Sequence, residues 1–191
     1  MKIVFATHNT NKLKEVQLLL PNTLNLLSLT DIDCHDEIPE TADTLEGNAI
    51  LKANYVTQNY GYPCFADDTG LLVDHLNGAP GVYTARYAGP EKSAATNMEK
   101  LLKALANTKN RKAHFKTAIA LNINQETQIF TGIIKGQINT IQKGIGGFGY
   151  DPVFIPNGYH KTFAELPLSV KNTISHRAIA VQKLVQYLKQ L

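Results

Sequence analysis

The sequence has no tryptophan, only two cysteines and two methionines, and no long apolar run. Cys34 and Cys64 are too few for a disulfide framework or a zinc site. No apolar stretch approaches the roughly 20 residues that cross a bilayer. Residues 1–6 predict a strand rather than an apolar targeting segment. These absences predict a soluble, cytoplasmic protein with no membrane partner.

Charge is also scarce in this chain. Charged residues make up 18% of it, and the net charge of +3 comes without any run of like charges. This small net charge is too low for a protein that binds duplex nucleic acid, but it suits a protein that binds a small anion. The apolar fraction of 43% and the length of 191 residues predict one globular domain, residues 1–191, with a substantial core.

Helical and strand periodicities alternate at first, and two long strands follow. The predicted helices span residues 11–20, 44–60, 96–106 and 175–188. The predicted strands span residues 2–6, 24–29, 64–66, 114–124 and 128–139. The last two strands have a short link and should be antiparallel. The pattern predicts an α/β fold with a mixed β-sheet and flanking helices.

The segment "THNTNK", residues 7–12, separates the first predicted strand from the first predicted helix. Free N–H groups and the positive end of the helix dipole favour an anion there, and Lys12 adds a cation. An ordinary helix cap, with Asn9 or Thr10 as the capping residue and Lys12 in solvent, explains the same residues. The segment lacks the glycines and the Gly-Lys-Ser/Thr ending of a P-loop.

The segment "FADDTG" places Asp67 and Asp68 directly after a predicted buried strand. A carboxylate in that position needs a partner, a metal ion or a chemical role. Glu40 lies upstream in an acidic loop, and together with Asp68 it could hold Mg²⁺, while Lys52 reaches the phosphates of a substrate. A turn cap at Asp67 and solvated glutamates fit the same spacing.

Two C-terminal segments add candidate binding residues. In "KNTISHR", Lys171 precedes His176 and Arg177, which are expected in the first turn of the last helix with side chains pointing outward, after Ser175 as the cap. Cations there oppose the helix dipole and suggest an anion or purine-edge site, although a solvated turn is the alternative. In "GGFGYDPVF", residues 146–154, glycines flank aromatic rings that could hold a flat ligand; core packing is the alternative.

Five segments in order resemble the noncanonical purine nucleoside triphosphate pyrophosphatases, also called inosine/xanthosine triphosphate pyrophosphatases. The resemblance runs from Ala6 to about Ala180 and rests on the segments "THNTNK", "ETADTLEGNAILKA", "ADDTGLLVDHLNGAPGVYTARYAG", "GGFGYDPVF" and "KNTISHR". It implies a homodimer of chains with an elongated mixed sheet and two lobes around a central cleft. It also implies Mg²⁺-dependent cleavage of ITP, dITP and XTP to the monophosphate and pyrophosphate, which cleanses the nucleotide pool.

The resemblance also implies roles for individual residues. Asp68 is similar to the catalytic proton acceptor, and Glu40 and Asp68 are similar to the metal ligands. The positions similar to substrate contacts are Thr7, His8, Asn9, Thr10, Asn11, Lys12, Lys52, Thr69, Phe148, Gly149, Tyr150, Asp151, Lys171, His176 and Arg177.

A few positions depart from the family pattern. His8 stands where glycine is common, Thr69 and Thr84 stand where serine is usual, and Ala42-Asp43 replaces a glycine-containing step. Two alternatives stay open at this point. One is a Maf-type pyrophosphatase of different base specificity, and the other is a non-catalytic nucleotide- or RNA-binding module. Acidic groups repel phosphate unless a metal ion intervenes, which favours an enzyme.

Overall fold

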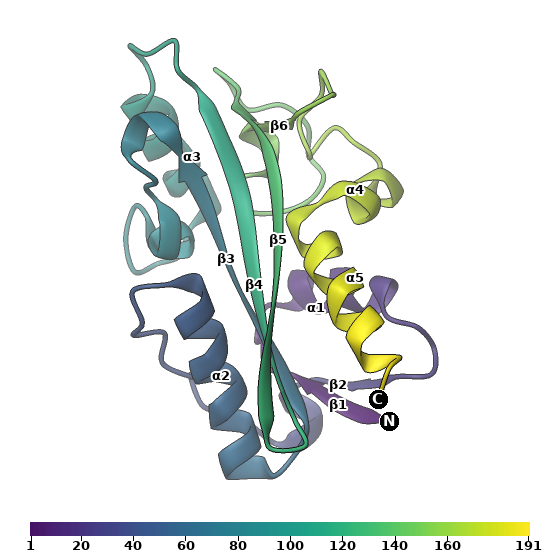
Figure 1. The fold of residues 1–191 in the computed structure, drawn as a ribbon. Coiled ribbons are helices and arrows are strands. Elements are labelled where there is room, and N and C mark those ends of the chain that lie inside the picture. The colour runs from purple at the N-terminus through teal and green to yellow at the C-terminus, as the bar shows by residue number, and fades with distance from the viewer. The chain divides into compact units, whose positions relative to one another are not determined.

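The computed structural model describes all 191 residues and contains one six-stranded sheet with helices packed against it (Figure 1). The strand order is β2-β1-β3-β4-β5-β6. The strands are β1 (Lys2–Phe5), β2 (Asn25–Leu27), β3 (Cys64–Val73), β4 (Lys112–Ile123), β5 (Glu126–Ile138) and β6 (Phe154–Pro156). The helices are α1 (Thr10–Leu19), α2 (Leu45–Tyr60), α3 (Ala94–Ala104), α4 (Leu168–Ile174) and α5 (His176–Leu188). None of these helices has the length and apolar character that crossing a membrane requires.

The sheet is mixed, as the alternation of elements predicts. Strand β1 pairs in parallel with both β2 and β3, whereas β6 pairs antiparallel with β5. Strands β4 and β5 are neighbours in the sheet and form a long hairpin (Figure 1), and Asn124 and Gln125 are the two residues between them. Both turn residues have positive φ, 51° and 66°, as tight hairpin turns require.

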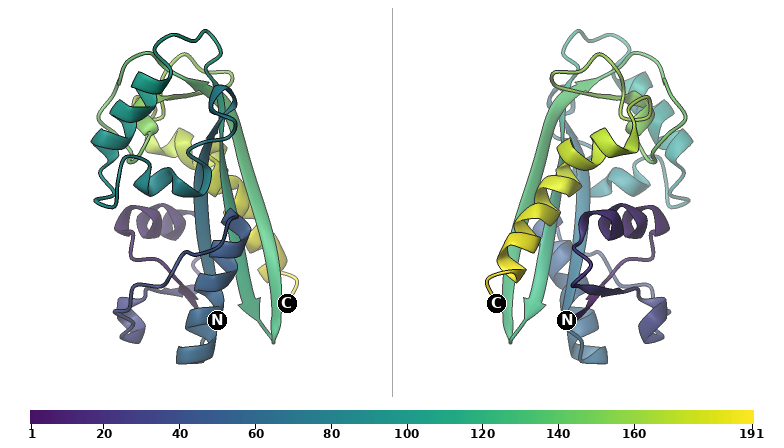
Figure 2. Two further views of the ribbon diagram at one scale, coloured as in Figure 1. Left: turned by 90° about the vertical axis from the view of Figure 1, so that its left-hand side faces the viewer. Right: turned by 90° about the vertical axis from the view of Figure 1, so that its right-hand side faces the viewer.

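The chain divides into two compact units, each built from segments that are not contiguous in sequence. The first unit comprises Met1–Asp68, Thr117–Gly132 and Arg177–Leu191. The second comprises Thr69–Lys116 and Ile133–His176. Both chain ends belong to the first unit and lie at the same end of it (Figures 1 and 2). The single domain, the elongated shape and the cleft between lobes stay predictions.

Helices cover both faces of the sheet in the first unit. Successive residues of a strand point to opposite faces, and the two core clusters follow this alternation. On one face, Val4 of β1 packs with Ala49, Ala53 and Val56 of α2. On the other face, Ile3 and Phe5 of β1 pack with residues of helices α1 and α5. These residues are Val16 of α1 and Ala180, Val181 and Leu184 of α5. The strands are buried on both faces, so the sheet is a rigid support for the loops that follow its strands.

Capping residues mark the ends of helices α1 and α2. Thr44 caps α2 by accepting from the backbone N–H of Gly47, and Gly61 ends the helix with a φ of 72°. Asn9 caps α1, accepting from the N–H groups of Asn11 and Lys12. Residues 7–9 therefore form a short connection between β1 and α1, at the carboxyl end of a parallel strand, and residues 10–12 make the first turn of the helix.

The second unit has a core rich in aromatic side chains. Phe115, Phe154 and Phe163 lie within ring-contact distance of one another, with centroid separations of 4.7 to 6.4 Å. Tyr150 lies in the same cluster, and its hydroxyl donates to the carbonyl oxygen of Thr84 at 2.9 Å. Tyr150, Val153 and Phe154 belong to this core, which therefore anchors the C-terminal half of residues 146–154.

Two predicted strands have other bounds in the structure, and two short elements, β6 and α4, were not predicted. Strand β3 does not stop at residue 66; it runs through both aspartates to Val73. Strand β2 is shorter than predicted, at Asn25–Leu27. Helix α4 lies where no helix was predicted. Ser175 has an extended conformation and separates α4 from α5. The prediction that Asp67 and Asp68 follow the strand is therefore wrong.

Candidate active site

Lys12 lies in the first turn of α1, and its ammonium group is held inside the molecule. Its Nζ donates to Oδ1 of Asp67 at 2.9 Å, and the side chain is only 15% exposed. The alternative of a solvated Lys12 is therefore wrong, although the accompanying prediction of a cap at Asn9 is confirmed. Of the neighbouring residues, Thr7 is partly buried, and His8, Asn9, Thr10 and Asn11 are exposed.

Asp67 is a buried carboxylate between two cations. Its second oxygen, Oδ2, accepts from Nε of Arg177 at 3.2 Å, and the side chain is 1% exposed. Arg177 in turn donates from Nη1 to Oε2 of Glu15 at 2.6 Å. The prediction that Arg177 points outward is wrong, since its side chain is 2% exposed. A turn cap at Asp67 is also excluded, since it sits inside β3 and pairs with Lys12 and Arg177.

The pKa values of this group follow from its burial and its charges. Burial acts to raise the pKa of Asp67, but the cations of Lys12 and Arg177 hold it far below its usual range. Burial lowers the pKa of Lys12, and the charge of Asp67 offsets that effect only in part. Asp67 therefore stays ionised as the counter-charge of Lys12 and Arg177 and is a poor acceptor of protons.

Asp68 is the neighbouring carboxylate on β3 and has a different environment. Its Oδ2 accepts from Nδ2 of Asn48 at 3.0 Å, and its Oδ1 lies 3.8 Å from Nζ of Lys52. The same ammonium donates to Oε1 of Glu40 at 2.6 Å. Glu40 and Asp68 therefore both lie beside the ammonium of Lys52, and their role as magnesium ligands stays a prediction.

Burial and neighbouring charges together set the pKa values of Asp68 and Lys52, and both are raised. Burial raises the pKa of Asp68 above its ordinary value, although Lys52 and Lys12 act against that shift. Burial acts to lower the pKa of Lys52, but Asp68 and Glu40 together raise it. A carboxylate with a raised pKa is better suited to accept a proton near neutral pH than one with a depressed pKa. Asp68, and not Asp67, has this property.

The structure contains no cluster of three or more His, Cys, Asp or Glu side chains arranged to hold a metal ion. A Mg²⁺ site does not need one, because this ion is bound by one or two carboxylates together with substrate phosphates and water. Glu40 and Asp68 have the oxygen donors that Mg²⁺ prefers and already share a cation, the ammonium of Lys52. The donor set fits the predicted magnesium ion.

His8 ties the loop at residues 7–12 to the acidic loop. Its Nε2 lies 2.9 Å from the backbone oxygen of Asp36, which can only accept, so Nε2 carries the proton. The carboxylate of Asp36 accepts from the hydroxyls of Tyr55 at 2.7 Å and Tyr60 at 3.3 Å, both on α2. His8, which stands where glycine is common, therefore forms a hydrogen bond to the backbone of Asp36.

In the second unit, Asp151 organises the turn that contains Phe148. Its Oδ2 accepts from the backbone N–H of Phe148 at 2.8 Å and from Nζ of Lys171 at 2.5 Å. That ammonium also lies over the Phe148 ring, 4.9 Å from its centroid. Gly147 and Gly149, on either side of Phe148, have φ values of 70° and 62°. Phe148, Asp151 and Lys171 thus form one group, and Phe148 keeps part of its surface exposed.

The side chains of His176 and Tyr150 are buried. The imidazole of His176 stacks on Phe115 with 4.6 Å between centroids, and the residue is 4% exposed, so the prediction that it points outward is wrong. The side chain of Tyr150 belongs to the core, which is the alternative that the sequence left open. Thr69 is partly buried in β3, next to Asp68.

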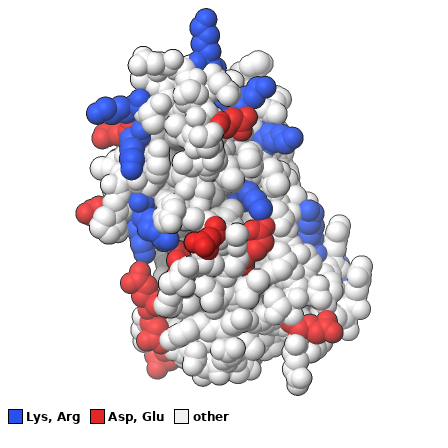
Figure 3. Space-filling model, turned by 60° about the vertical axis from the view of Figure 1, so that its left-hand side comes forward, with Lys and Arg blue, Asp and Glu red and all other residues white.

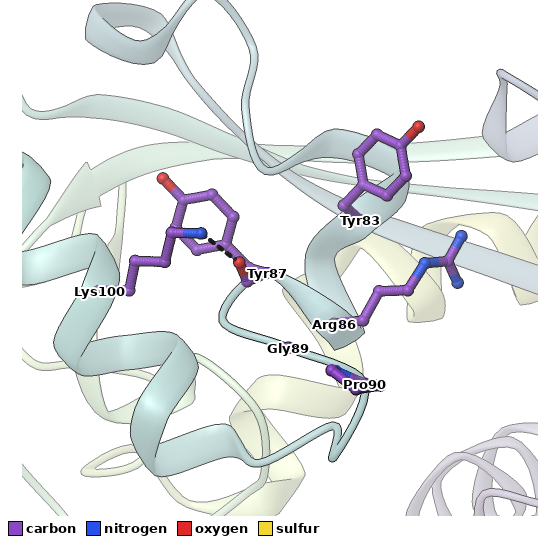
Figure 4. Close-up of a pocket in the computed structure, with 6 residues that line it drawn as sticks. All are labelled: Tyr83, Arg86, Tyr87, Gly89, Pro90 and Lys100. Atoms are coloured by element: carbon purple, nitrogen blue, oxygen red, sulfur yellow. Dashed lines mark hydrogen bonds between the residues drawn. The ribbon is translucent and has the colours of Figure 1, made fainter.

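A separate open cavity of about 510 Å³ lies on the second unit and contains none of the predicted site residues. It is lined by Tyr83, Arg86, Tyr87, Gly89, Pro90 and Lys100 (Figure 4). Its cations face aromatic rings within the chain, with Lys100 over Tyr87 at 4.4 Å and Arg86 over Tyr83 at 5.3 Å. Lys100 also donates to the Tyr87 carbonyl. Figure 3 shows side chains of both charge signs on one face of the molecule, as the small net charge implies.

Comparison with known proteins agrees with the motifs. The model of the Ham1 family matches residues 3–187. The chain belongs to the Ham1 family. It is 63% identical to a dITP/XTP pyrophosphatase of Flavobacterium johnsoniae over 98% of both chains. It is 51% identical to a protein of the same name from Porphyromonas gingivalis, over 98% of this chain and 97% of that one.

Solved structures of Ham1 proteins have the same fold. The Ham1 protein of Staphylococcus aureus matches with a TM-score of 0.91 and 38% identity, covering 100% of this chain and 99% of that one. The HAM1 protein of Coxiella burnetii matches with a TM-score of 0.92 and 38% identity over 100% of both chains. These findings confirm the family resemblance and the α/β fold class, and the Maf-type alternative loses its support.

Two residues of the site were missed by the sequence reading. Asn48 precedes Lys52 by one helical turn and Glu15 follows Lys12 by three residues, so each shares a helix face with a predicted residue. A polar side chain on the buried stripe of a helix was the available signal in both cases, because such a group needs a partner.

Proposed function

We propose that this Ham1-family protein is a pyrophosphatase that hydrolyses noncanonical purine nucleoside triphosphates, ITP, dITP and XTP, to the monophosphate and pyrophosphate. The observation that carries the proposal is the pair of adjacent aspartates with opposite environments. Asp67 is neutralised by two cations, whereas Asp68 has a raised pKa and shares a cation with Glu40. The names of the relatives support the same activity.

Residues 7–12, which include Lys12, and Lys52 of α2 are assigned to the triphosphate. Backbone N–H groups at the start of α1 and the ammonium of Lys12 supply donors where a helix dipole favours an anion. Lys52 adds a second cation beside Asp68. Phosphoryl transfer depends mainly on positioning and neutralisation of charge, so these groups would lower the barrier.

Glu40 and Asp68 would hold a magnesium ion. Bound there, the ion would neutralise charge on the phosphates and act as a Lewis acid. The displacement itself is assigned to residues of the chain. Asp68 accepts a proton from a water molecule whose oxygen forms a bond to the α-phosphorus. The bond from the α-phosphorus to the bridging oxygen breaks, and that oxygen leaves with pyrophosphate while Lys12 and Lys52 stabilise its negative charge.

Recognition of the base is assigned to the group around Phe148. Its ring offers a face for a purine, worth about 1–3 kcal/mol on the scale of base–aromatic stacking. Asp151 and Lys171 are the polar side chains in contact with Phe148, and His176 stacks on Phe115 in the same unit. Hypoxanthine and xanthine present a 6-carbonyl acceptor and a protonated ring nitrogen, whereas adenine presents a 6-amino donor and an unprotonated ring nitrogen. A pocket built for the first pattern leaves its own polar groups unpaired when adenine enters, and this rejects adenine strongly. Guanine shares the carbonyl and should be refused less strongly.

The assembly and cellular location are part of the same proposal. A homodimer and a cytoplasmic location fit an enzyme that acts on free nucleotides, and no nucleic-acid partner is required.

The test is hydrolysis of a panel of triphosphates with and without Mg²⁺. The proposal expects Mg²⁺-dependent turnover, with kcat/KM for dITP, ITP and XTP well above that for GTP and with ATP last. Equal use of ATP and ITP would contradict the account of base recognition. Turnover of modified pyrimidine nucleotides alone would favour a Maf-type specificity, and binding without turnover would favour a non-catalytic module.

A further inference from the structure

The acidic loop, residues 33–44, is bonded along one face of helix α2. Asp36, Glu40 and Ala42 of the loop each form a hydrogen bond with the helix. Their partners are Tyr55 and Tyr60 for Asp36, Lys52 for Glu40 and Asn48 for Ala42. The first three of these helix positions are spaced four and three residues apart, so they lie on one side of α2. The loop therefore runs antiparallel to α2 and is bonded to it at three points.

Apolar contacts hold the same loop from inside the first unit. Cys34 and Ile38 are buried in one core cluster with apolar side chains of α2. The acidic loop and helix α2 thus form one body, through side-chain packing as well as hydrogen bonds. That body carries both Glu40 and Lys52 of the candidate site.

His8 joins this body to the segment that precedes helix α1. Its Nε2 donates to the backbone oxygen of Asp36 at 2.9 Å. The neighbours of His8 shape the backbone locally, because the hydroxyl of Thr7 accepts from the N–H of Asn9 at 3.1 Å and Asn9 caps the helix. The imidazole then fixes where this segment stands relative to the acidic loop. Glycine, which is common at position 8, has no side chain that could form this bond.

The two parts that His8 connects carry different groups of the candidate site. Lys12 lies in the first turn of α1, whereas Glu40 and Lys52 lie on the body formed by the acidic loop and α2. One exposed hydrogen bond contributes little to the stability of a whole fold. Binding groups must nevertheless be held close to their productive geometry, and small displacements weaken their action. A bond between the two parts can therefore set the separation of their binding groups.

We propose that His8 is a positioning residue for nucleotide binding, which holds the start of α1, with Lys12, against the acidic loop that carries Glu40. The inference rests on the proposed function, since a triphosphate with its Mg²⁺ is the ligand that both parts would bind together. The bond from His8 to Asp36 lies within the protein and needs no ligand. His8 therefore acts before the substrate arrives, unlike the direct substrate contact that the family resemblance implies for this position.

The first test is steady-state hydrolysis of dITP in saturating Mg²⁺, which gives KM and kcat separately. We expect His8→Leu to raise KM about fivefold, the scale of one hydrogen bond, with kcat changed less than about twofold. His8→Gln keeps an N–H donor at a similar reach and should raise KM less than about twofold. The matched control is His160→Leu, an exposed histidine of the second unit, which should leave both constants unchanged.

The second test needs no activity and uses the protein without nucleotide or metal ion. The backbone N–H groups of Asn11 and Lys12 are bonded to the cap at Asn9, and NMR measures their hydrogen exchange. Loss of the bond to Asp36 should free the segment before α1, so that these amides exchange about fivefold faster in His8→Leu than in wild type or His8→Gln. A raised KM with unchanged exchange would mean that the imidazole contacts substrate directly, and it would overturn the inference.

A double-mutant cycle tests whether His8 acts through Asp36. Asp36→Ala releases the loop from the hydroxyls of Tyr55 and Tyr60 and so displaces the carbonyl that His8 binds. In that background, His8→Leu should change KM less than about twofold. An equal fivefold rise of KM in both backgrounds would overturn the inference. Thermal unfolding checks each variant, and if Asp36→Ala does not fold, the double variant Tyr55→Phe, Tyr60→Phe releases the same carboxylate and is held to the same criterion.

Failure of the proposed function has a different signature. A wild type that hydrolyses no dITP overturns that function and this inference together. An active wild type with a KM unaffected by His8→Leu overturns the inference alone.

Discussion

The side-chain amide of Asn48 donates to Oδ2 of Asp68 at 3.0 Å, while its own oxygen accepts the backbone N–H of Ala42 at 2.9 Å. Asn48 is fully buried, so both bonds form away from solvent. The contact with Ala42 fixes which end of the amide faces Asp68. Asn48 therefore holds one carboxylate oxygen and leaves the other directed toward Lys52, at 3.8 Å.

Replacement of Asp68 by Asn should nearly abolish turnover without unfolding the protein. The change preserves shape but removes the negative charge that would hold Mg²⁺ and accept a proton from water. We expect a loss of kcat on the order of 10²-fold or more. Asp74→Asn, an exposed residue after the same strand, is the matched control. An Asp68→Asn variant with more than a small fraction of the wild-type kcat would show that the base is another residue.

Replacement of Asp67 by Asn should act mainly on the stability of the fold. The variant leaves two cations, Lys12 and Arg177, facing a neutral amide inside the molecule. Breaking a buried pair in this way costs about 3–5 kcal/mol in favourable cases, so we expect a loss of at least about 2 kcal/mol in the free energy of unfolding. Urea unfolding measures it. A loss below about 0.5 kcal/mol, the scale of an ordinary surface substitution, would mean that the ion pairs contribute little.

These two aspartates also show where prediction from sequence ends. The hydrophobic pattern located the start of the strand that carries them and the helix at residues 44–60, because those signals are local. It ended the strand too early, because a charged pair is unfavourable inside a sheet unless partners reach it. The partners of Asp67 are 55 and 110 residues away in sequence, and no local period encodes them.

Phe148→Ala should weaken use of the nucleotide without changing affinity for pyrophosphate. Loss of one base–aromatic stack, about 1–3 kcal/mol, corresponds to roughly 5- to 150-fold in kcat/KM for dITP. Phe148→Tyr keeps an aromatic face and serves as the control. The inhibition constant of pyrophosphate, which has no base, should stay the same. A Phe148→Ala variant with normal kcat/KM would show that the ring does not stack on substrate.

Gly147→Ala and Gly149→Ala form a matched pair of tests for the turn around Phe148. Both glycines have positive φ, so both substitutions bring a similar backbone strain. An added Cβ at Gly147 would clash with Oδ2 of Asp151, whereas one at Gly149 meets nothing within 4 Å. We expect Gly147→Ala to cost about 1–3 kcal/mol more than Gly149→Ala in urea unfolding. Equal losses would mean that the Asp151 contact does not fix the turn.

The same turn illustrates a site that the sequence described only in part. The glycines in "GGFGYDPVF" indicated an unusual backbone, and the structure has Gly147 and Gly149 at positive φ. The role of Asp151 was not readable, since its main partner, Lys171, lies 20 residues further along the chain. The burial of His176 and Arg177 was missed for a similar reason. Charged groups at a helix start usually face solvent, and here carboxylates and an aromatic ring from other elements receive them.

Phosphorus NMR of the reaction products tests the central claim most directly. The wild-type protein is incubated with dITP and Mg²⁺, without any added inorganic pyrophosphatase, and the spectrum is followed over time. The account predicts equal amounts of pyrophosphate and deoxyinosine monophosphate, with no orthophosphate, because the attack occurs at the α-phosphorus. Formation of deoxyinosine diphosphate and orthophosphate would contradict it.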